Sequence, residues 1–160
     1  MERPHRSLWH AALLVGCLVF PSGLSADASH AQAPYVLPET VKSWLEHGQA
    51  VSFLDVREAD EFHAGHIPGA RNIPHDQVPG LAGELPHNQP IVVYCIHSAH
   101  RAPEAAKVLR AQGFDNAYVM EGGIVAWDAG GQTIRASDLT RQPKILPLTN
   151  RCADKEKPPS

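Results

Sequence analysis

The sequence predicts an α/β fold in which a parallel β-sheet is flanked by helices on both faces. Three short apolar segments, at 51–55, 91–94 and 117–120, have the length and composition of buried strands. Each is followed by a segment with the pattern of a helix, and strands that are joined through helices run parallel. The 160 residues, 43% hydrophobic and 19% charged, suit one domain with additional residues at its ends.

The first residues have the features of a secretory signal peptide. Two arginines precede an apolar run over 8–20, and a small-x-small cleavage site follows at 26–28. We therefore expect residues 1–28 to be removed and the mature protein to be periplasmic or secreted, without a membrane attachment. Two alternatives stay open. The run could remain inserted in a membrane, although it is short, or Cys17 could be acylated, because Leu-Val-Gly-Cys resembles a lipobox.

The first half of the mature chain alternates helix and strand. Residues 29–37 are small, polar and contain proline, which predicts a linker. A helix is predicted over 38–48, where apolar residues at i, i+3 and i+4 lie between a starting proline and a final glycine. The strand over 51–55 is then followed by a short helix over 57–63 and a short strand over 70–74.

The second half completes a domain predicted to span residues 38–135. Four prolines and two glycines over 74–90 indicate irregular structure with one helical turn near 78–84. The two remaining strands are each followed by a helix, over 103–112 and 124–129. Ligands of such a sheet bind at the carboxyl ends of its strands.

Two cysteines remain once the signal peptide is removed, Cys95 and Cys152. Cys152 lies in the C-terminal extension, 136–160, a polar tail that cannot build a core, so a structural disulfide is not expected. Cys152 is either an idle thiol or one that resolves an oxidised or persulfidated Cys95.

Cys95 opens a seven-residue loop that joins the strand at 91–94 to the following helix. The N–H groups at a helix N-terminus, together with the helix dipole, stabilise an anion, whether a thiolate or a bound oxyanion. This position makes Cys95 the candidate nucleophile of the chain.

The composition excludes several classes of partner. A net charge of −3 shows no basic excess, so neither nucleic acid nor an anionic membrane surface is expected. No phosphate-binding glycine pattern is present. Cys95, His97 and His100 have the order of a metal motif, but a metal would occupy the nucleophile. We therefore expect no metal and no organic cofactor.

Three motifs, in order, resemble the signatures of rhodanese domains. The first is Asp-Val-Arg-Glu-Ala-Asp-Glu-Phe-His-Ala-Gly-His-Ile-Pro-Gly-Ala, which begins at Asp55. The second is Val-Tyr-Cys at 93–95, and the third is Tyr-Val-Met-Glu-Gly-Gly-Ile-Val-Ala-Trp at 118–127. The resemblance covers residues 38–131 and implies a rhodanese-like parallel sheet in a single-domain sulfurtransferase.

The resemblance also implies a reaction. Cys95 would attack the sulfane sulfur of a small donor such as thiosulfate and become a persulfide. It would then pass the sulfur to cyanide or to a thiol, including a thiol of a partner protein. The substrate anion is expected to be held by Arg101 and by the backbone amides of Ile96, His97, Ser98, Ala99 and His100.

The loop also resembles that of Cdc25-type phosphatases and their arsenate-reductase relatives. Rhodanese loops with an arginine commonly place it five positions after the cysteine, whereas Cys95 and Arg101 have five residues between them, the phosphatase spacing. A guanidinium there binds two oxygens of a tetrahedral oxyanion. However, Tyr94 stands where those phosphatases carry histidine, and the loop has no acidic residue. The sulfurtransferase interpretation is therefore favoured, and a non-catalytic sulfur carrier or binding module is a further alternative.

Three charged residues near the end of the strand at 51–55 are expected to support this loop. Asp55 and Glu58 are three apart and resemble a helix-capping pair, and Arg57 is expected to pair with a carboxylate. Two other candidates are assigned to structure: His66 to the Gly-His-Ile-Pro-Gly-Ala motif and Trp127 to the core.

Overall fold

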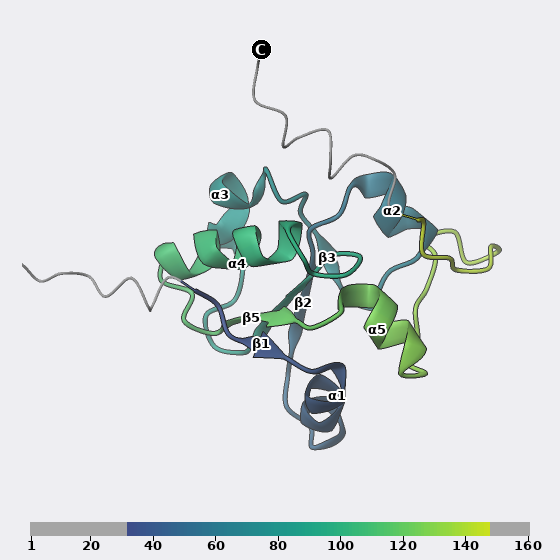
Figure 1. The fold of residues 1–160 in the computed structure, drawn as a ribbon, viewed down its shortest axis with the longest axis horizontal. Helices are drawn as coiled ribbons and strands as arrows, with labels where there is room; N and C mark the ends of the chain where they lie inside the picture. The colour runs from purple at the N-terminus through teal and green to yellow at the C-terminus, as the bar shows by residue number, and fades with distance from the viewer. Residues whose placement is uncertain (1–31, 148–160) are drawn as a thin grey trace, which may run out of the picture.

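A computed structural model describes residues 32–147 of the protein, which form one sheet with helices on both faces (Figure 1). The sheet has five strands in the order β1-β5-β4-β2-β3, and every neighbouring pair is parallel. The predicted parallel α/β fold is therefore confirmed. The strands are β1 (Tyr35–Val36), β2 (Ser52–Asp55), β3 (Arg71–Asn72), β4 (Ile91–Tyr94) and β5 (Ala117–Met120).

Alternate residues of the central strands face two separate cores. In β4, Ile91 and Val93 pack with α3 and α4, whereas Val92 and Tyr94 pack with α1 and α5. Figure 1 shows these two pairs of helices on opposite sides of the sheet. Because both faces are covered, all four residues of β4 are buried. The helices are α1 (Pro38–Glu46), α2 (Ala59–Ala64), α3 (Val78–Leu81), α4 (Arg101–Ala111) and α5 (Gly123–Ala129), with a 3₁₀ turn, η2 (Ala82–Glu84).

The predicted linker over 29–37 is wrong at its end, because Tyr35 and Val36 form the edge strand β1. The N–H group of Val119 donates to the carbonyl of Pro34, and the N–H group of Glu121 donates to that of Val36, both at 2.9 Å. A strand of two residues is too short to show the alternation of apolar and polar side chains by which a strand is recognised in a sequence.

Three helices begin at different residues from those predicted, and the difference is smallest in α5, which begins one residue early at Gly123. The helix α4 begins at Arg101, two residues early, with Pro103 in its first turn. Proline is tolerated there because the first N–H groups of a helix have no partner within it, and the first bond of α4 runs from Glu104 to the carbonyl of His100. The helix α2 begins at Ala59, two residues late, with Glu58 as its N-cap.

The described part of the C-terminal extension, 136–147, packs on α2 rather than extending as a polar tail. Ala136 is buried, the N–H group of Ser137 donates to the carbonyl of His63, and that of Lys144 donates to the carbonyl of Ala64. A side chain at Gly65 would lie 2.6 Å from the carbonyl oxygen of Lys144. The absence of a side chain at Gly65 therefore lets this segment lie against α2.

Several predictions concern residues outside the described range. They are the signal peptide over 1–28, the acylation site at Cys17, and the resolving role of Cys152. Within residues 32–147, none of the helices has both the length and the apolar character needed to cross a membrane.

The contact between Gly65 and the C-terminal extension can be tested by a stability measurement. We expect Gly65→Ala to lower the free energy of unfolding by about 1–3 kcal/mol, because the methyl group would displace the backbone at Lys144. Urea denaturation measures this loss. Gly80→Ala is the control, since a methyl group there meets nothing within 4 Å. Equal stability of the two variants would contradict the packing described.

Candidate active site

The fold places Cys95 at the carboxyl end of the central strand β4, in the loop that leads into α4. Cys95 is 5% exposed, and its N–H group faces the hydroxyl of Ser98 at 3.4 Å. Ser98 is also buried, and its φ of 52° lies in the left-handed region that few residues other than glycine adopt. The loop is therefore tightly curled around its buried hydroxyl, with Ile96 buried and His97, Ala99 and His100 exposed.

The start of the loop is held by the first turn of α5. The N–H groups of Ile124 and Val125 donate to the carbonyls of Cys95 and Ile96, at 3.0 and 3.2 Å. In a trans peptide the carbonyl and the following N–H group point in opposite directions. These contacts therefore direct the N–H groups of Ile96 and His97 away from α5.

This contact requires glycine at position 123. A side chain there would lie 2.4 Å from the carbonyl oxygens of both Cys95 and Ile96, and the φ of Gly123 is 61°. Both the space and the backbone conformation exclude other residues. In the sequence, Gly123 is only one residue of the third motif, so its contact with the loop is a finding of the structure.

The end of the loop is held by an ion pair with α2. The guanidinium of Arg101 donates through both terminal nitrogens to the two carboxylate oxygens of Glu61, at 2.7 and 3.1 Å. Both residues are 7% exposed. Glu61 also accepts the N–H group of Glu58, which completes a capping box at the start of α2. The predicted Asp55 and Glu58 capping pair is therefore wrong, because the reciprocal partner of Glu58 is Glu61.

A second buried ion pair lies at the end of β2, the neighbour of β4. Arg57 donates to Asp55 through its Nε atom at 2.9 Å and to the carbonyl of Gly65 at 2.7 Å, and both charged side chains are fully buried. This confirms that Arg57 pairs with a carboxylate. The guanidinium lies 5.8 Å from the ring centre of Tyr94, whose hydroxyl accepts the N–H group of Ile67. Asp55 thus lies beside Tyr94, the last residue of the strand that leads to the cysteine, and Arg57 lies near the Tyr94 ring.

The environment of this pair shifts two protonation equilibria. The pKa of the Tyr94 hydroxyl is raised well above its ordinary value, first by burial and then by the negative charge of Asp55. The pKa of Arg57 is also raised: burial acts to lower it, but the hydrogen bond and charge of Asp55 outweigh burial. Tyr94 therefore keeps its proton, and Arg57 keeps its charge.

The histidines outside the loop have structural contacts. The Nδ1 atom of His66 donates to the carbonyl of Phe62, and the two rings stack at 3.9 Å. His66 therefore has the structural role that was predicted. Between residues 32 and 147, no three His, Cys, Asp or Glu side chains come together in a way that could hold a metal ion.

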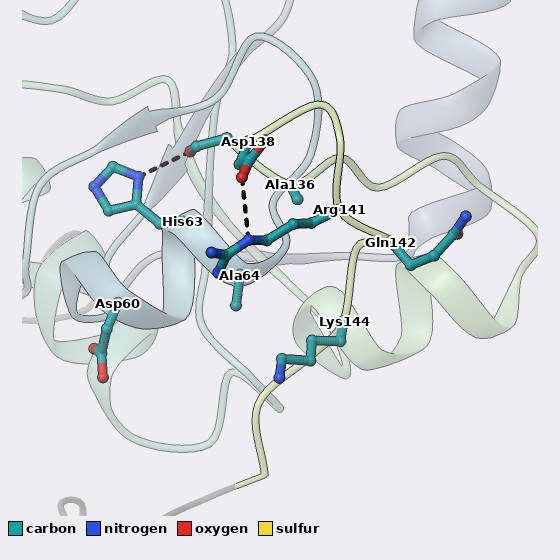
Figure 2. A pocket seen from close by; sticks show the side chains of 9 residues that line it. Asp60, His63, Ala64, Ala136, Asp138, Arg141, Gln142 and Lys144 are labelled. Atoms are coloured by element: carbon teal, nitrogen blue, oxygen red, sulfur yellow. Dashed lines mark hydrogen bonds and ion pairs between the residues drawn. The ribbon is translucent and has the colours of Figure 1, made fainter.

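A surface cavity of about 680 Å³ lies between α2 and the C-terminal extension, away from the cysteine loop (Figure 2). At the rim of this cavity, the ring of His63 forms a hydrogen bond with the hydroxyl of Ser137, and Arg141 forms an ion pair with Asp138. The face of α2 that lines it carries Asp60, His63 and Ala64, whereas Glu61 contacts Arg101. None of the predicted site residues lines this cavity.

The structure therefore brings the predicted residues together in one place and adds two that were not predicted. Residues 95 to 101 follow β4 as one segment, and Asp55 and Arg57 lie at the end of the neighbouring strand β2. The added residues are Glu61, which the spacing of a capping box with Glu58 could have identified, and Gly123, for which the sequence gives no signal beyond a pair of glycines.

Substitution of Gly123 is expected to disturb the loop. We expect Gly123→Ala to lower the free energy of unfolding by about 2–4 kcal/mol, since the methyl group overlaps two carbonyl oxygens in addition to the backbone strain. The rate at which iodoacetamide alkylates Cys95 should also change in the Gly123→Ala variant. Gly131→Ala is the matched control, because it has a similar φ of 71° with open space around it, and strain alone costs about 1–2 kcal/mol. Equal losses of stability in Gly123→Ala and Gly131→Ala would contradict the steric overlap at position 123.

The ion pair of Glu61 gives a pH dependence of stability. Burial acts to raise the pKa of Glu61, but the hydrogen bonds from Arg101 and from the Glu58 backbone outweigh burial, so the folded pKa is lowered. The pair's contribution is therefore fully present above the unfolded value, about pH 4.3, and is lost as the pH falls through the folded pKa. Urea denaturation of wild type and Glu61→Gln should show a stability difference at neutral pH that shrinks on acidification. A stability difference between wild type and Glu61→Gln that stays constant with pH would contradict this contribution of the ion pair.

Comparisons with known proteins show that the chain is similar to sulfurtransferases. The chain is 34% identical over 83 residues to the thiosulfate sulfurtransferase GlpE of Shewanella oneidensis, an alignment that covers 52% of this chain and 81% of that protein. It is 36% identical over 110 residues to the probable adenylyltransferase/sulfurtransferase MoeZ of Mycobacterium tuberculosis, covering 66% of this chain but only 28% of that longer protein.

The chain is also similar to a solved structure and to a family profile. The rhodanese-like domain of Alr3790 from Anabaena sp., solved by NMR, has a TM-score of 0.60 and 29% identity, with 73% of this chain and 89% of that chain covered. The profile of the Rhodanese-like domain matches residues 37–130, more than half of the chain. The chain therefore belongs to the rhodanese-like domain family, which includes sulfurtransferases.

Proposed function

We propose that this protein is a sulfurtransferase that moves a sulfane sulfur through a persulfide on Cys95. The observation that carries the proposal is the position of Cys95, at the carboxyl end of the central strand and at the start of a loop fixed at both ends. The first turn of α5 holds the carbonyls of Cys95 and Ile96, and Glu61 holds Arg101. A nucleophile in such a loop stays in one place relative to the backbone N–H groups of that loop.

The reaction has two steps, each of which exchanges one bond for another. In the first, the Cys95 thiolate attacks the outer sulfur of a donor such as thiosulfate. A new S–S bond forms, the donor's S–S bond breaks, and sulfite leaves with the electron pair. In the second, cyanide or a thiolate attacks the outer sulfur of the Cys95 persulfide. Thiocyanate or a new persulfide forms, and the Cys95 thiolate is regenerated without an external oxidant.

The backbone amides from Ile96 to His100 are proposed to hold the anionic groups of the bound donor and of the persulfide. Two of these amides are directed away from α5 by its contacts with the preceding carbonyls. Asp55 and Arg57 are proposed to support the site through Tyr94, because both are fully buried, pair with each other and lie next to Tyr94. Arg101 is proposed to fix the end of the loop and to face the donor in its paired state.

The phosphatase alternative is less well supported by this geometry. A phosphatase of the Cys-x5-Arg type needs the positive charge of its guanidinium to bind two oxygens of the substrate, but the charge of Arg101 is already balanced by Glu61. It also needs an acid to protonate the leaving group. Glu61, the buried carboxylate that contacts the end of the loop, has its pKa lowered by its hydrogen bond with Arg101, which favours the ionised form.

The signal-peptide motif supports a further proposal about location. Export to the periplasm or the exterior would place the protein in an oxidising compartment, where sulfur donors and thiol acceptors with disulfide chemistry occur. N-terminal sequencing of the exported protein tests this proposal. A mature chain that begins at Ser29 or close to it is expected, and an uncut chain beginning at Met1 would contradict it.

The proposed activity is tested by assaying two reactions on the mature protein. We expect cyanide-dependent formation of thiocyanate from a sulfane donor, and no hydrolysis of a small aryl phosphate. Cys95→Ala should reduce sulfur transfer to the background rate, since no other thiol lies in the loop. The matched control is Cys152→Ala, which removes the other cysteine of the mature chain and should retain turnover.

Two outcomes would overturn the proposal. Phosphate release that depends on Cys95, without sulfur transfer, would assign the Cys-x5-Arg chemistry instead. Loading of Cys95 with sulfur but no turnover with cyanide or small thiols would make the protein a sulfur carrier.

A further inference from the structure

The buried charges beside the cysteine loop cancel one another. Arg57 is paired with Asp55, and Arg101 is paired with Glu61, in each case by at least two hydrogen bonds. The two pairs also interact, because Arg57 and Glu61 affect each other's protonation through their charges. The cluster thus holds two positive and two negative groups, and a donor bound in the loop meets no net positive charge from it.

The paired state of Arg101 matters most, because Arg101 carries the only permanent positive charge between positions 95 and 101. A free guanidinium binds a sulfonate or phosphate through two parallel N–H···O bonds. In this protein the corresponding nitrogens bind the two oxygens of Glu61, at 2.7 and 3.1 Å, and both side chains are less than a tenth exposed. Glu61 thus takes two of the five N–H donors of this guanidinium and balances its charge, so a bound anion would meet an arginine that is already neutralised.

Charge is costly at this position because the nucleophile is enclosed. Cys95 is 5% exposed, so a donor must lose much of its water as its outer sulfur approaches. The cost of removing water rises steeply with charge unless an opposite charge replaces it. Thiosulfate carries two negative charges, whereas an alkanethiosulfonate or an alkyl persulfide anion carries one.

We infer that Glu61 is a specificity-determining residue that makes this site favour singly charged sulfane donors over doubly charged thiosulfate. The inference rests on the proposed sulfur transfer through Cys95 and names the class of donor for it. Glu61 acts through Arg101, by neutralising the one cation that could balance a second negative charge. The donor class consists of compounds whose outer sulfur is attached to a sulfonyl or thiol sulfur with a neutral substituent.

The step with such a donor balances in the same way as that with thiosulfate. With methanethiosulfonate, the Cys95 thiolate attacks the outer sulfur, the Cys95 persulfide anion forms, and methanesulfinate leaves with the electron pair of the broken S–S bond. With an alkyl persulfide, the leaving group is the alkyl thiolate. In both cases one negative charge leaves with the product, compared with two in sulfite.

The test compares thiosulfate with methanethiosulfonate, which has the same reacting sulfur and one charge less. Formation of thiocyanate from each donor is measured with cyanide at about pH 8, where imidazole side chains are mostly neutral. The readout is the kcat/KM for thiosulfate divided by that for methanethiosulfonate. Comparison of this ratio between variants removes the intrinsic difference in reactivity of the two donors.

Glu61→Gln should raise the ratio by about tenfold, since it leaves Arg101 with its charge uncompensated beside the loop. Glu104→Gln is the matched control. It removes the same charge from the first turn of α4, but from an exposed side chain, and should change the ratio by less than about twofold. A folded Glu61→Gln protein with an unchanged or lower ratio would overturn the inference.

A double variant keeps the test decisive if Glu61→Gln alone fails to fold. Glu61→Gln with Arg101→Gln removes both charges, so no buried charge is left alone, and its ratio should stay close to that of the wild type. A ratio that falls about tenfold in the double variant would show that Arg101 attracts the second charge despite Glu61, and would overturn the inference. Failure of the wild type to transfer sulfur from either donor would instead overturn the proposed function.

Discussion

The ion pair between Arg101 and Glu61 is the interaction on which the rest of the site depends. It joins the first residue of α4 to the first turn of α2, and so fixes the end of the cysteine loop to a separate part of the chain. Glu61 can do this because it is held in turn by the N–H group of Glu58. Without the pair, the chain would bury an arginine at the end of the loop with its charge unbalanced, which is strongly unfavourable. The same contact anchors the end of the loop and balances the charge of Arg101.

The start of the loop is held in place because residue 123 has no side chain, and no charge is involved. Gly123 has no side chain, so α5 approaches closely enough for its N–H groups to bind the carbonyls of Cys95 and Ile96. Between these two anchors, Ser98 adopts a left-handed conformation with its hydroxyl near the N–H group of Cys95. The fully buried strand β4 provides a rigid base for the nucleophile. The loop thus presents a cysteine in a fixed position, which is the requirement for passing a single sulfur atom between two small partners.

Much of the fold could be predicted, because its elements carry local signals. The apolar runs of β4 and β5 and the proline and glycine boundaries of α1 identify these elements in the sequence, and their alternation gives the parallel sheet. The edge strand at Tyr35 and Val36 could not, because two residues show no period and their pairing with β5 is a contact distant in sequence. The C-terminal segment was missed for a similar reason: its contacts with α2 use backbone groups, and such groups leave no trace in the side-chain pattern.

The candidate site, too, contains residues that the sequence predicts and residues that only the fold reveals. Cys95 and the extent of its loop follow from the strand and helix on either side, and Arg57 was expected to find a carboxylate. The roles of Glu61 and Gly123 depend on which elements meet in space, as does the pairing of Arg101, which spacing alone assigned to a substrate anion. A charged side chain near a nucleophile can be recognised in the sequence. Whether another residue already neutralises its charge is decided by the fold.

The central claim is that Cys95 carries the sulfur, and a single-turnover mass measurement tests it most directly. The protein is mixed with a sulfane donor in the absence of an acceptor, digested, and its cysteine-containing peptides are weighed before and after addition of cyanide. The account predicts one additional sulfur atom per chain on the peptide that contains Cys95, which disappears as thiocyanate forms. A Cys95 peptide of unchanged mass, with thiocyanate still produced, would contradict it.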